Sequence, residues 1–203
     1  MKLKTWFIFL MISTIGVLLS LANAPKIFEY HLLENQQSEI NNTDEAYNKM
    51  MDVLTHQRCM NYHPNDNIHK QGNDLHSHYF GMERGEDDKG FQATICNACH
   101  NSENNKYSGV PRAPHWSLAP ASMGWEGLTR SQIPERLVDK NVYGQRSFDE
   151  LVKHMTEDEL VLWAWSPGID TNDQEREIPP VSKEEFKNVV EYWFDNGAVI
   201  PTK

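Results

Sequence analysis

The chain has 203 residues and carries 19 lysines and arginines against 29 aspartates and glutamates, a formal net charge of −10 at pH 7. This acidic balance argues against a nucleic-acid-binding protein, because such a protein needs basic side chains for the phosphates. About 180 residues follow the first 24, which is enough for one domain with a modest hydrophobic core.

Residues 1–24 have the pattern of an export signal, in which two lysines precede a long apolar run that ends in Ala22-Asn23-Ala24. The apolar run is longer than the core of a usual signal peptide, and Pro25 directly follows the expected cleavage position. A retained anchor in the inner membrane, through residues 5–22, is therefore the alternative. Both interpretations predict that the rest of the chain is periplasmic.

Residues 25–43 are polar and rich in amide side chains, so we expect a tether that leads to a folded domain at residues 44–203. Without the first 24 residues, 17 basic side chains remain against 29 acidic ones, a net charge of −12. We expect such an exterior to dock on the basic surface of a partner protein by long-range attraction. The alternative is that the acidic side chains only keep an exported protein in solution.

Apolar residues at helical spacing predict four helices, at about residues 44–57, 147–155, 157–165 and 182–195. Ser147 and Ser182 each stand three residues before a glutamate, which is the sequence pattern of a capping box. Residues 61–125 are rich in Asn, Gly, Pro and His and show no sustained period. We therefore expect long loops there, held in place by a cofactor rather than by backbone pairing.

Residues 96–100 read Cys-Asn-Ala-Cys-His, the pattern by which a chain attaches haem c. The thiols of Cys96 and Cys99 can bond to the haem vinyl groups while His100 binds the iron, and the short spacing puts all three on one turn. The alternative is a chance pair of thiols in a disulfide or a zinc site. Zinc would need two further Cys or His ligands at short spacing, and the sequence has no clear second pair.

Residues 59–63 read Cys-Met-Asn-Tyr-His, so Tyr62 stands where the second cysteine of the same pattern would be. Cys59 and His63 can still hold a haem by one thioether bond and one iron ligand, with the Tyr62 phenol against a propionate or the ring edge. The sequence thus predicts two haems c, and one at least. The alternative is that the first haem has been lost, which leaves Cys59 as a free thiol.

The iron ligands on the opposite side are less well defined by the sequence. Histidine on both sides of the iron usually gives a low reduction potential, whereas methionine raises it. The leading candidates are His154 on a predicted helix, His115 and Met123 in a proline-rich segment, and His78 in a predicted loop. Further histidines remain open as candidates at positions 56, 69 and 76. Tryptophans 116, 125, 163, 165 and 193 are expected to line haem pockets.

The stretches RCMNYHP, QGNDLHSH, CNACH, SGVPRAPHWSLAPASMGWEGL, HMTEDELVLWAWSPG and GAVIP resemble a family of small bacterial cytochrome c proteins, often labelled isoquinoline 1-oxidoreductase subunit. The resemblance implies a dihaem electron carrier, with one haem at Cys96, Cys99 and His100 and the other at Cys59 and His63. Tyr62 departs from the family pattern. No molybdopterin, flavin or nucleotide fingerprint is present, so the chain could at most pass electrons for such an oxidoreductase.

Taken together, these patterns predict a mainly α fold, in which cytochrome c-like helices and long loops wrap around one or two c-type haems. The expected function is that of an exported c-type cytochrome that transfers single electrons to a redox partner protein, rather than that of an enzyme. One alternative is a small haem enzyme that reduces peroxide or a nitrogen oxide at an open iron face of the first haem. A carrier with a single haem, and a haem sensor or assembly factor, are also compatible with the sequence.

Overall fold

The computed structural model describes residues 40, 42–142 and 146–202. The predicted signal or anchor at 1–24, and residues 25–39 of the predicted tether, lie outside the described residues. Within the described ranges, no helix is both long enough and apolar enough to cross a bilayer. The chain from residue 40 onward forms one unit by its internal contacts, and both cysteine motifs lie in this unit.

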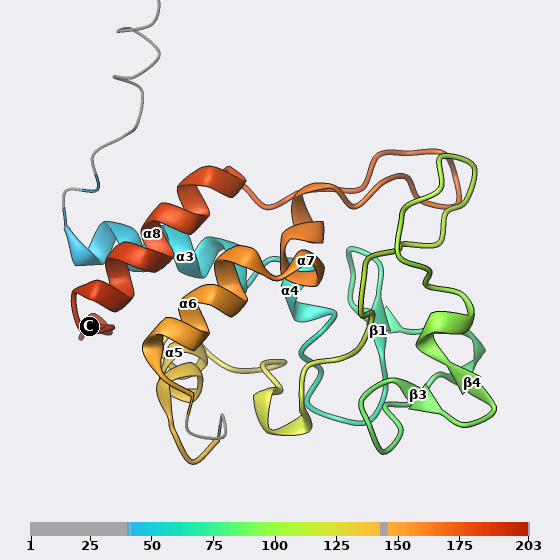
Figure 1. Ribbon diagram of the computed structural model, residues 1–203, viewed down its shortest axis with the longest axis horizontal. Helices are drawn as coiled ribbons and strands as arrows, with labels where there is room; N and C mark the ends of the chain where they lie inside the picture. Colours follow the sequence, from blue (N-terminus) through green and yellow to red (C-terminus); the bar gives the residue numbers. More distant parts are fainter. Residues whose placement is uncertain (1–39, 41, 143–145, 203) are drawn as a thin grey trace, which may run out of the picture. The chain divides into compact units, whose positions relative to one another are not determined.

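The described residues contain six α-helices (Figure 1): α3 (Thr43–Leu54), α4 (Gln57–Met60), α5 (Gln132–Val138), α6 (Phe148–Glu157), α7 (Glu159–Leu162) and α8 (Lys183–Asp195). The helices predicted at 147–155 and 182–195 are confirmed. The helix predicted at 44–57 is confirmed as far as Leu54, and α4 then begins as a separate turn. The helix predicted at 157–165 is confirmed only over Glu159–Leu162, because Asp158 interrupts the helical backbone before it and a 3-10 turn replaces the α-helix after it.

Asp158 ends α6 with an extended backbone, and its side chain then accepts a hydrogen bond from the Leu160 backbone N–H at the start of α7. A 3-10 turn, Trp163–Trp165, follows α7. The short helix α5 was not predicted from the sequence. It contains Pro134 in its first turn, where the missing backbone N–H of proline removes no helical hydrogen bond.

The two predicted capping boxes form to different extents. Ser147 accepts from the Glu150 backbone N–H, and the Glu150 carboxylate accepts in return from the Ser147 backbone N–H at 2.8 Å. Ser182 likewise accepts from the Glu185 backbone N–H at 3.2 Å. The Glu185 carboxylate, however, pairs with Lys49 of α3 at 2.7 Å. The second glutamate therefore ties two helices together.

The main hydrophobic core lies between helices α3, α5, α6 and α8, with α8 packed on α3 and on α6 (Figure 1). The largest side chains that it buries completely include Met50, Met51, Ile133, Phe186 and Trp193. Each such side chain contributes roughly 1.5–3 kcal/mol by leaving water. The predicted apolar stripes of the first and last helices face each other in this core, which gives the helical part a source of stability of its own.

Residues 61–125 form a second part, made of loops and four short strands: β1 (Lys70–Gln71), β2 (His76–Ser77), β3 (Gly90–Phe91) and β4 (Thr94–Ile95). β1 pairs with β2, and β3 pairs with β4, both antiparallel. The prediction of long loops is confirmed, but the expectation that they lack backbone pairing is wrong. Gly90 permits the second pairing, because its φ is +89° and an added Cβ would lie 2.6 Å from the Thr94 carbonyl oxygen.

Candidate functional site

The Cys-Asn-Ala-Cys-His motif forms a single turn directly after β4. Cys96–Ala98 is a 3-10 helix, and the His100 backbone N–H donates to the Cys96 carbonyl at 2.9 Å. Cys96 is buried, whereas Cys99 is exposed, and both thiols are free. The turn therefore brings two thiols and an imidazole together, as the spacing predicts.

The orientation of His100 is fixed on two sides. Its Nδ1 atom lies 2.6 Å from the Pro111 carbonyl oxygen, and its ring stacks on Trp116 with centroids 4.3 Å apart and planes at 6°. A carbonyl oxygen only accepts hydrogen bonds, so Nδ1 carries the proton and Nε2 keeps its lone pair. Burial lowers the pKa of His100 to about 4, which keeps the imidazole neutral at pH 7. This is the form of histidine that binds a metal.

His63 of the first motif is held in the same way. Its Nδ1 atom donates to the Met123 carbonyl oxygen at 2.7 Å, and its ring stacks on Trp125 at 3.5 Å and 4°. Burial lowers its pKa to about 3. His63 and His100 therefore share three features: a carbonyl acceptor for Nδ1, a stacked tryptophan, and a free Nε2 lone pair.

Cys59 and Tyr62, the other residues of the first motif, face different surroundings. Cys59 packs against the helical core, and burial raises the pKa of its thiol to about 12. Tyr62 packs instead in a second, smaller cluster, with ring centroids 5.1 Å from Trp116 and 6.2 Å from Trp163. Cys96 of the second motif belongs to the same cluster. Tyr62 thus lies where the two motifs meet.

His78 lies opposite His100. Its Nδ1 atom donates to the Tyr79 carbonyl oxygen at 2.6 Å, so its Nε2 lone pair is also free. The ring centroids of His78 and His100 are 6.1 Å apart, with the planes at 67°. Imidazole nitrogens bind metals at about 2 Å, so two imidazoles on opposite sides of one metal have ring centres roughly 6 Å apart. The spacing of His78 and His100 would let the two rings bind one metal from opposite sides, and the ring centroids of His69 and His78 have the same separation of 6.1 Å.

A fourth histidine, His154, lies on α6 near His63. Its charge lowers the pKa of His63 by less than burial does, whereas the hydrogen bond to the Met123 carbonyl raises that pKa. The His154 Nδ1 atom lies 3.2 Å from the Asp158 carboxylate, which again leaves Nε2 with a lone pair. This hydrogen bond is the largest cause of the lowered pKa of Asp158. His154 also lines a surface cavity of about 480 Å³.

Two other predicted candidates are placed differently. Met123 has 1% of its surface exposed and lies in the helical core, and its backbone carbonyl is the group that holds His63. His115 is exposed and has a left-handed backbone with φ of +57°. The structure therefore gives Met123 a positioning contact with His63, and it brings His115 into no contact with either motif histidine.

The ring nitrogens of the remaining described histidines make other contacts than those of the four histidines above. The Nδ1 atom of His56 accepts from the Arg58 backbone N–H, so this nitrogen is unprotonated. His76 has partners on both ring nitrogens, at 2.5 Å and 2.9 Å. The Nε2 atom of His69 lies 3.8 Å from the Cys96 sulfur. None of the three shows the arrangement shared by His63, His78, His100 and His154.

A cofactor in this region would account for buried polar atoms that lack partners. Six such side-chain atoms occur in the described residues, and all lie between positions 61 and 125: Asn61 Oδ1, Tyr62 Oη, His69 Nδ1, Arg84 Nε, Arg112 Nε and Trp125 Nε1. Buried polar atoms are nearly always paired, so their concentration around the two motifs fits a missing polar group there. Within the described ranges, no group of three or more His, Cys, Asp and Glu is arranged to hold a bare metal ion.

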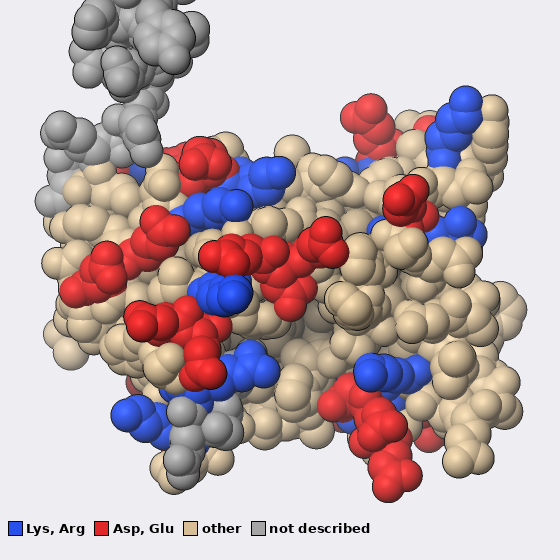
Figure 2. Space-filling model, in the orientation of Figure 1, with Lys and Arg blue, Asp and Glu red and all other residues tan. Residues whose placement is uncertain are grey.

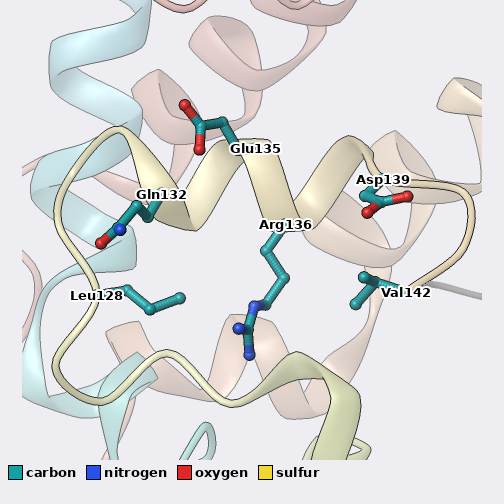
Figure 3. A pocket seen from close by; sticks show the side chains of 6 residues that line it. All are labelled: Leu128, Gln132, Glu135, Arg136, Asp139 and Val142. Carbon is teal, nitrogen blue, oxygen red and sulfur yellow. The ribbon is translucent and has the colours of Figure 1, made fainter.

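Another cavity, of about 280 Å³, lies beside α5 (Figure 3). It is lined by Leu128, Gln132, Glu135, Arg136, Asp139 and Val142. The Arg136 side chain points to the neighbouring loop, where it donates to the Gly124 carbonyl at 2.8 Å. No residue of either motif lines this cavity, so it belongs to the support of the loop rather than to the histidine sites.

Sequence reasoning missed the carbonyl groups that orient the histidines. Pro111 and Met123 lie 11 and 60 residues from the histidines that they hold. No side-chain pattern marks a backbone acceptor, although the prolines around Pro111 indicate a rigid segment. A scan against protein-family models, a search of curated proteins and a search of solved structures find no match to this chain. The geometry of the two motifs is therefore the feature of the molecule that bears on its function.

Proposed function

We propose that this chain is a c-type cytochrome that carries single electrons and holds two haems. Cys96, Cys99 and His100 would hold one haem, and Cys59 and His63 would hold the other through one thioether bond. Haem iron held in this way supplies a reversible one-electron couple. The resemblance to small bacterial cytochromes, the cytochrome c-like fold and export to the periplasm, with a cleaved signal or a retained anchor, are part of the same proposal.

The observation that carries the proposal is the common arrangement of four histidines. His63, His78, His100 and His154 each donate from Nδ1 to an oxygen acceptor, so each offers Nε2 to a metal. His78 and His100 are in ring contact, and His154 lies near His63. A six-coordinate haem iron needs two ligands from the protein, so two such haems need four, which is the number of these histidines. We therefore propose His78 opposite His100 and His154 opposite His63.

Electron transfer suits the exposure of the second motif. Cys99 is exposed, so a haem bonded to it would have an edge near the surface, where a partner can approach. Figure 2 shows acidic side chains interspersed with basic ones over the helical part of this face. The net charge of −10 nevertheless favours a partner with a basic docking surface and a weak, salt-sensitive encounter.

The direct test is the haem count of the full chain, produced with a c-type cytochrome maturation system. The intact mass and the pyridine-haemochrome content should give two haems per chain, one with the optical band of a single thioether. A matched pair of variants assigns them: Cys59→Ala should remove one haem from covalent attachment, and Cys96→Ala with Cys99→Ala the other. One haem per chain in the unaltered protein would mean that Tyr62 marks a lost site, and no haem would end the proposal.

A second candidate function is supported at the first motif only. The His154 side chain is 33% exposed and borders the surface cavity of about 480 Å³, so solvent reaches this proposed ligand of the first haem. A haem enzyme would need such access for peroxide or a nitrogen oxide. Cyanide distinguishes the two: an enzyme site should bind it and change its spectrum, whereas two low-spin haems with histidine on both sides should leave it unbound.

A further inference from the structure

Two arginines near the motifs donate hydrogen bonds only to neutral groups of the described residues. Arg58 precedes Cys59 and has 6% of its surface exposed. Its guanidinium donates to the Glu177 carbonyl oxygen at 3.1 Å and to the Asn73 side-chain oxygen. The Arg176 guanidinium donates to three backbone carbonyls, those of Pro167, Ile169 and Gly109.

The segment that contains Arg176 and Glu177 contacts the surroundings of both motifs. Arg58, which directly precedes the first motif, donates to the Glu177 backbone carbonyl. Arg176 donates to Gly109, which lies two residues before the Pro111 carbonyl that orients His100. The positive charges of Arg58 and Arg176 therefore lie at the contact between the motifs, and both are close enough to Tyr62 to lower the pKa of its phenol against the larger effect of burial.

A third arginine, Arg112, directly follows Pro111. Its Nε atom is buried without a partner, and its guanidinium donates to no acceptor within the described ranges. The Tyr62 hydroxyl is also buried without a partner. No carboxylate of the described residues forms an ion pair with Arg58, Arg112 or Arg176. Glu177 lies near enough to Arg58, and Asp170 to Arg176, to favour the charged form of each arginine, but neither carboxylate accepts a hydrogen bond from these guanidiniums. The Arg112 Nε and the Tyr62 hydroxyl remain buried donors without a partner, so this combination calls for an added acceptor.

We propose that Arg58, Arg112 and Arg176, together with the Tyr62 hydroxyl, form a carboxylate-binding site between the two motifs that receives haem propionate groups. This inference rests on the proposed function. Propionates suit the site because guanidinium groups bind carboxylates with paired hydrogen bonds, and a phenol donates one more. The unpartnered Arg112 Nε and the Tyr62 hydroxyl then gain an acceptor.

The test measures the midpoint potentials of the two haems in full-chain variants. Arg112→Gln is the main variant, because its guanidinium makes no hydrogen bond to the described residues that would be lost. Positive charge near the iron favours the reduced state, so Arg112→Gln should lower one midpoint potential and Arg112→Lys should restore most of it. We expect a change of about tenfold in the ratio of oxidised to reduced haem, which is about 59 mV for one electron. Arg176→Gln should lower the same potential.

The matched control is Arg130→Gln, which removes the same charge from a surface arginine paired with Asp52 at 2.8 Å. If Arg130→Gln and Arg112→Gln change the midpoint potential equally, the change comes from the net charge of the protein alone, and the inference is overturned. Midpoint potentials that change on addition of inorganic phosphate to the unaltered protein, but not to Arg112→Gln, would show a site for free anions and overturn the propionate assignment. Two bound haems with unchanged potentials in Arg112→Gln would overturn the inference alone. A chain without haem would overturn the proposed function with it.

Discussion

His78 is the residue that most sharply tests how the second haem would be held. Its Nδ1 atom donates to the Tyr79 carbonyl, and its ring centroid lies 6.1 Å from that of His100. We therefore propose that it binds the iron on the side opposite to His100. His78→Ala should convert one haem from low spin to high spin and let it bind cyanide, because one side of the iron loses its ligand. His115→Ala is the matched control, since His115 is exposed, and its spectrum should equal that of the unaltered protein. A low-spin spectrum in His78→Ala would point to His69 instead.

Buried imidazoles make the stability of the fold depend on pH. The pKa is lowered to about 3 for His63 and to about 4 for His69 and His100, whereas an unfolded histidine titrates near 6.5. Below that pH the unfolded chain takes up protons that the folded chain excludes. The free energy of unfolding should therefore decrease as the pH falls from about 6.5 to 4, by up to about 1.4 kcal/mol per pH unit for each imidazole.

Urea unfolding between pH 7 and pH 4 measures this dependence. In the proposed haem protein, iron bound at Nε2 would act with the same sign, because it would compete with the proton for the same atom. His69→Gln should make the slope shallower than that of the unaltered protein, since His69 is not among the proposed ligands. His115→Gln, at an exposed position, should leave the slope as it is. A free energy of unfolding that stays constant down to pH 4 would contradict the prediction.

Single residues also show what could be predicted without a structure. The sequence marks the thiols and the adjacent histidines, because covalent haem attachment requires them at fixed spacing. It does not mark which ring nitrogen of a histidine is free, because that depends on carbonyls 11 and 60 residues away. His76 and His78 lie two positions apart in the sequence. The structure distinguishes them by their partners, because Nε2 of His76 has a hydrogen-bond partner and Nε2 of His78 remains free.

At the scale of elements, the cap of α6 should matter for both stability and the first motif. Ser147 and Glu150 form a reciprocal capping box at the start of the helix that carries His154. Ser147→Ala should lower the free energy of unfolding by about 1 kcal/mol, the usual cost of losing such a cap. Ser131→Ala is the control, because Ser131 starts α5 without a side-chain cap bond. Equal losses in the two variants would show that the box contributes nothing specific.

The elements that could be predicted are those with a repeating apolar stripe. α3, α6 and α8 each place several apolar residues on one face, and the core they form is large enough to fix them. α5, with seven residues, and the two-residue strands are too short to show a period. Their positions depend on contacts with other segments, such as the donation from Arg136 of α5 to the Gly124 carbonyl. Sequence periodicity does not contain that information.

At the scale of the molecule, the two parts differ in what stabilises them. The helical part has a core of 19 buried residues, whereas the cluster beside the second motif has four. A variant with Cys59, Cys96 and Cys99 changed to Ala, produced without haem, should therefore keep slow hydrogen exchange in α3 and α8. It should lose protection in residues 61–125. Hydrogen exchange with mass spectrometry separates the two parts, and equal protection of both would contradict the prediction.

Tyr62 gives the whole molecule a property that neither motif has alone. It belongs to the first motif, yet its ring packs on Trp116, which also stacks on His100 of the second motif. These apolar rings lie between the motifs, so charge at one site is screened from the other less than it would be in water. In the proposed dihaem protein, an electron on one iron would make the next electron harder to add. Uptake of the two electrons would then show negative cooperativity, and the molecule would pass charge in two steps of different driving force.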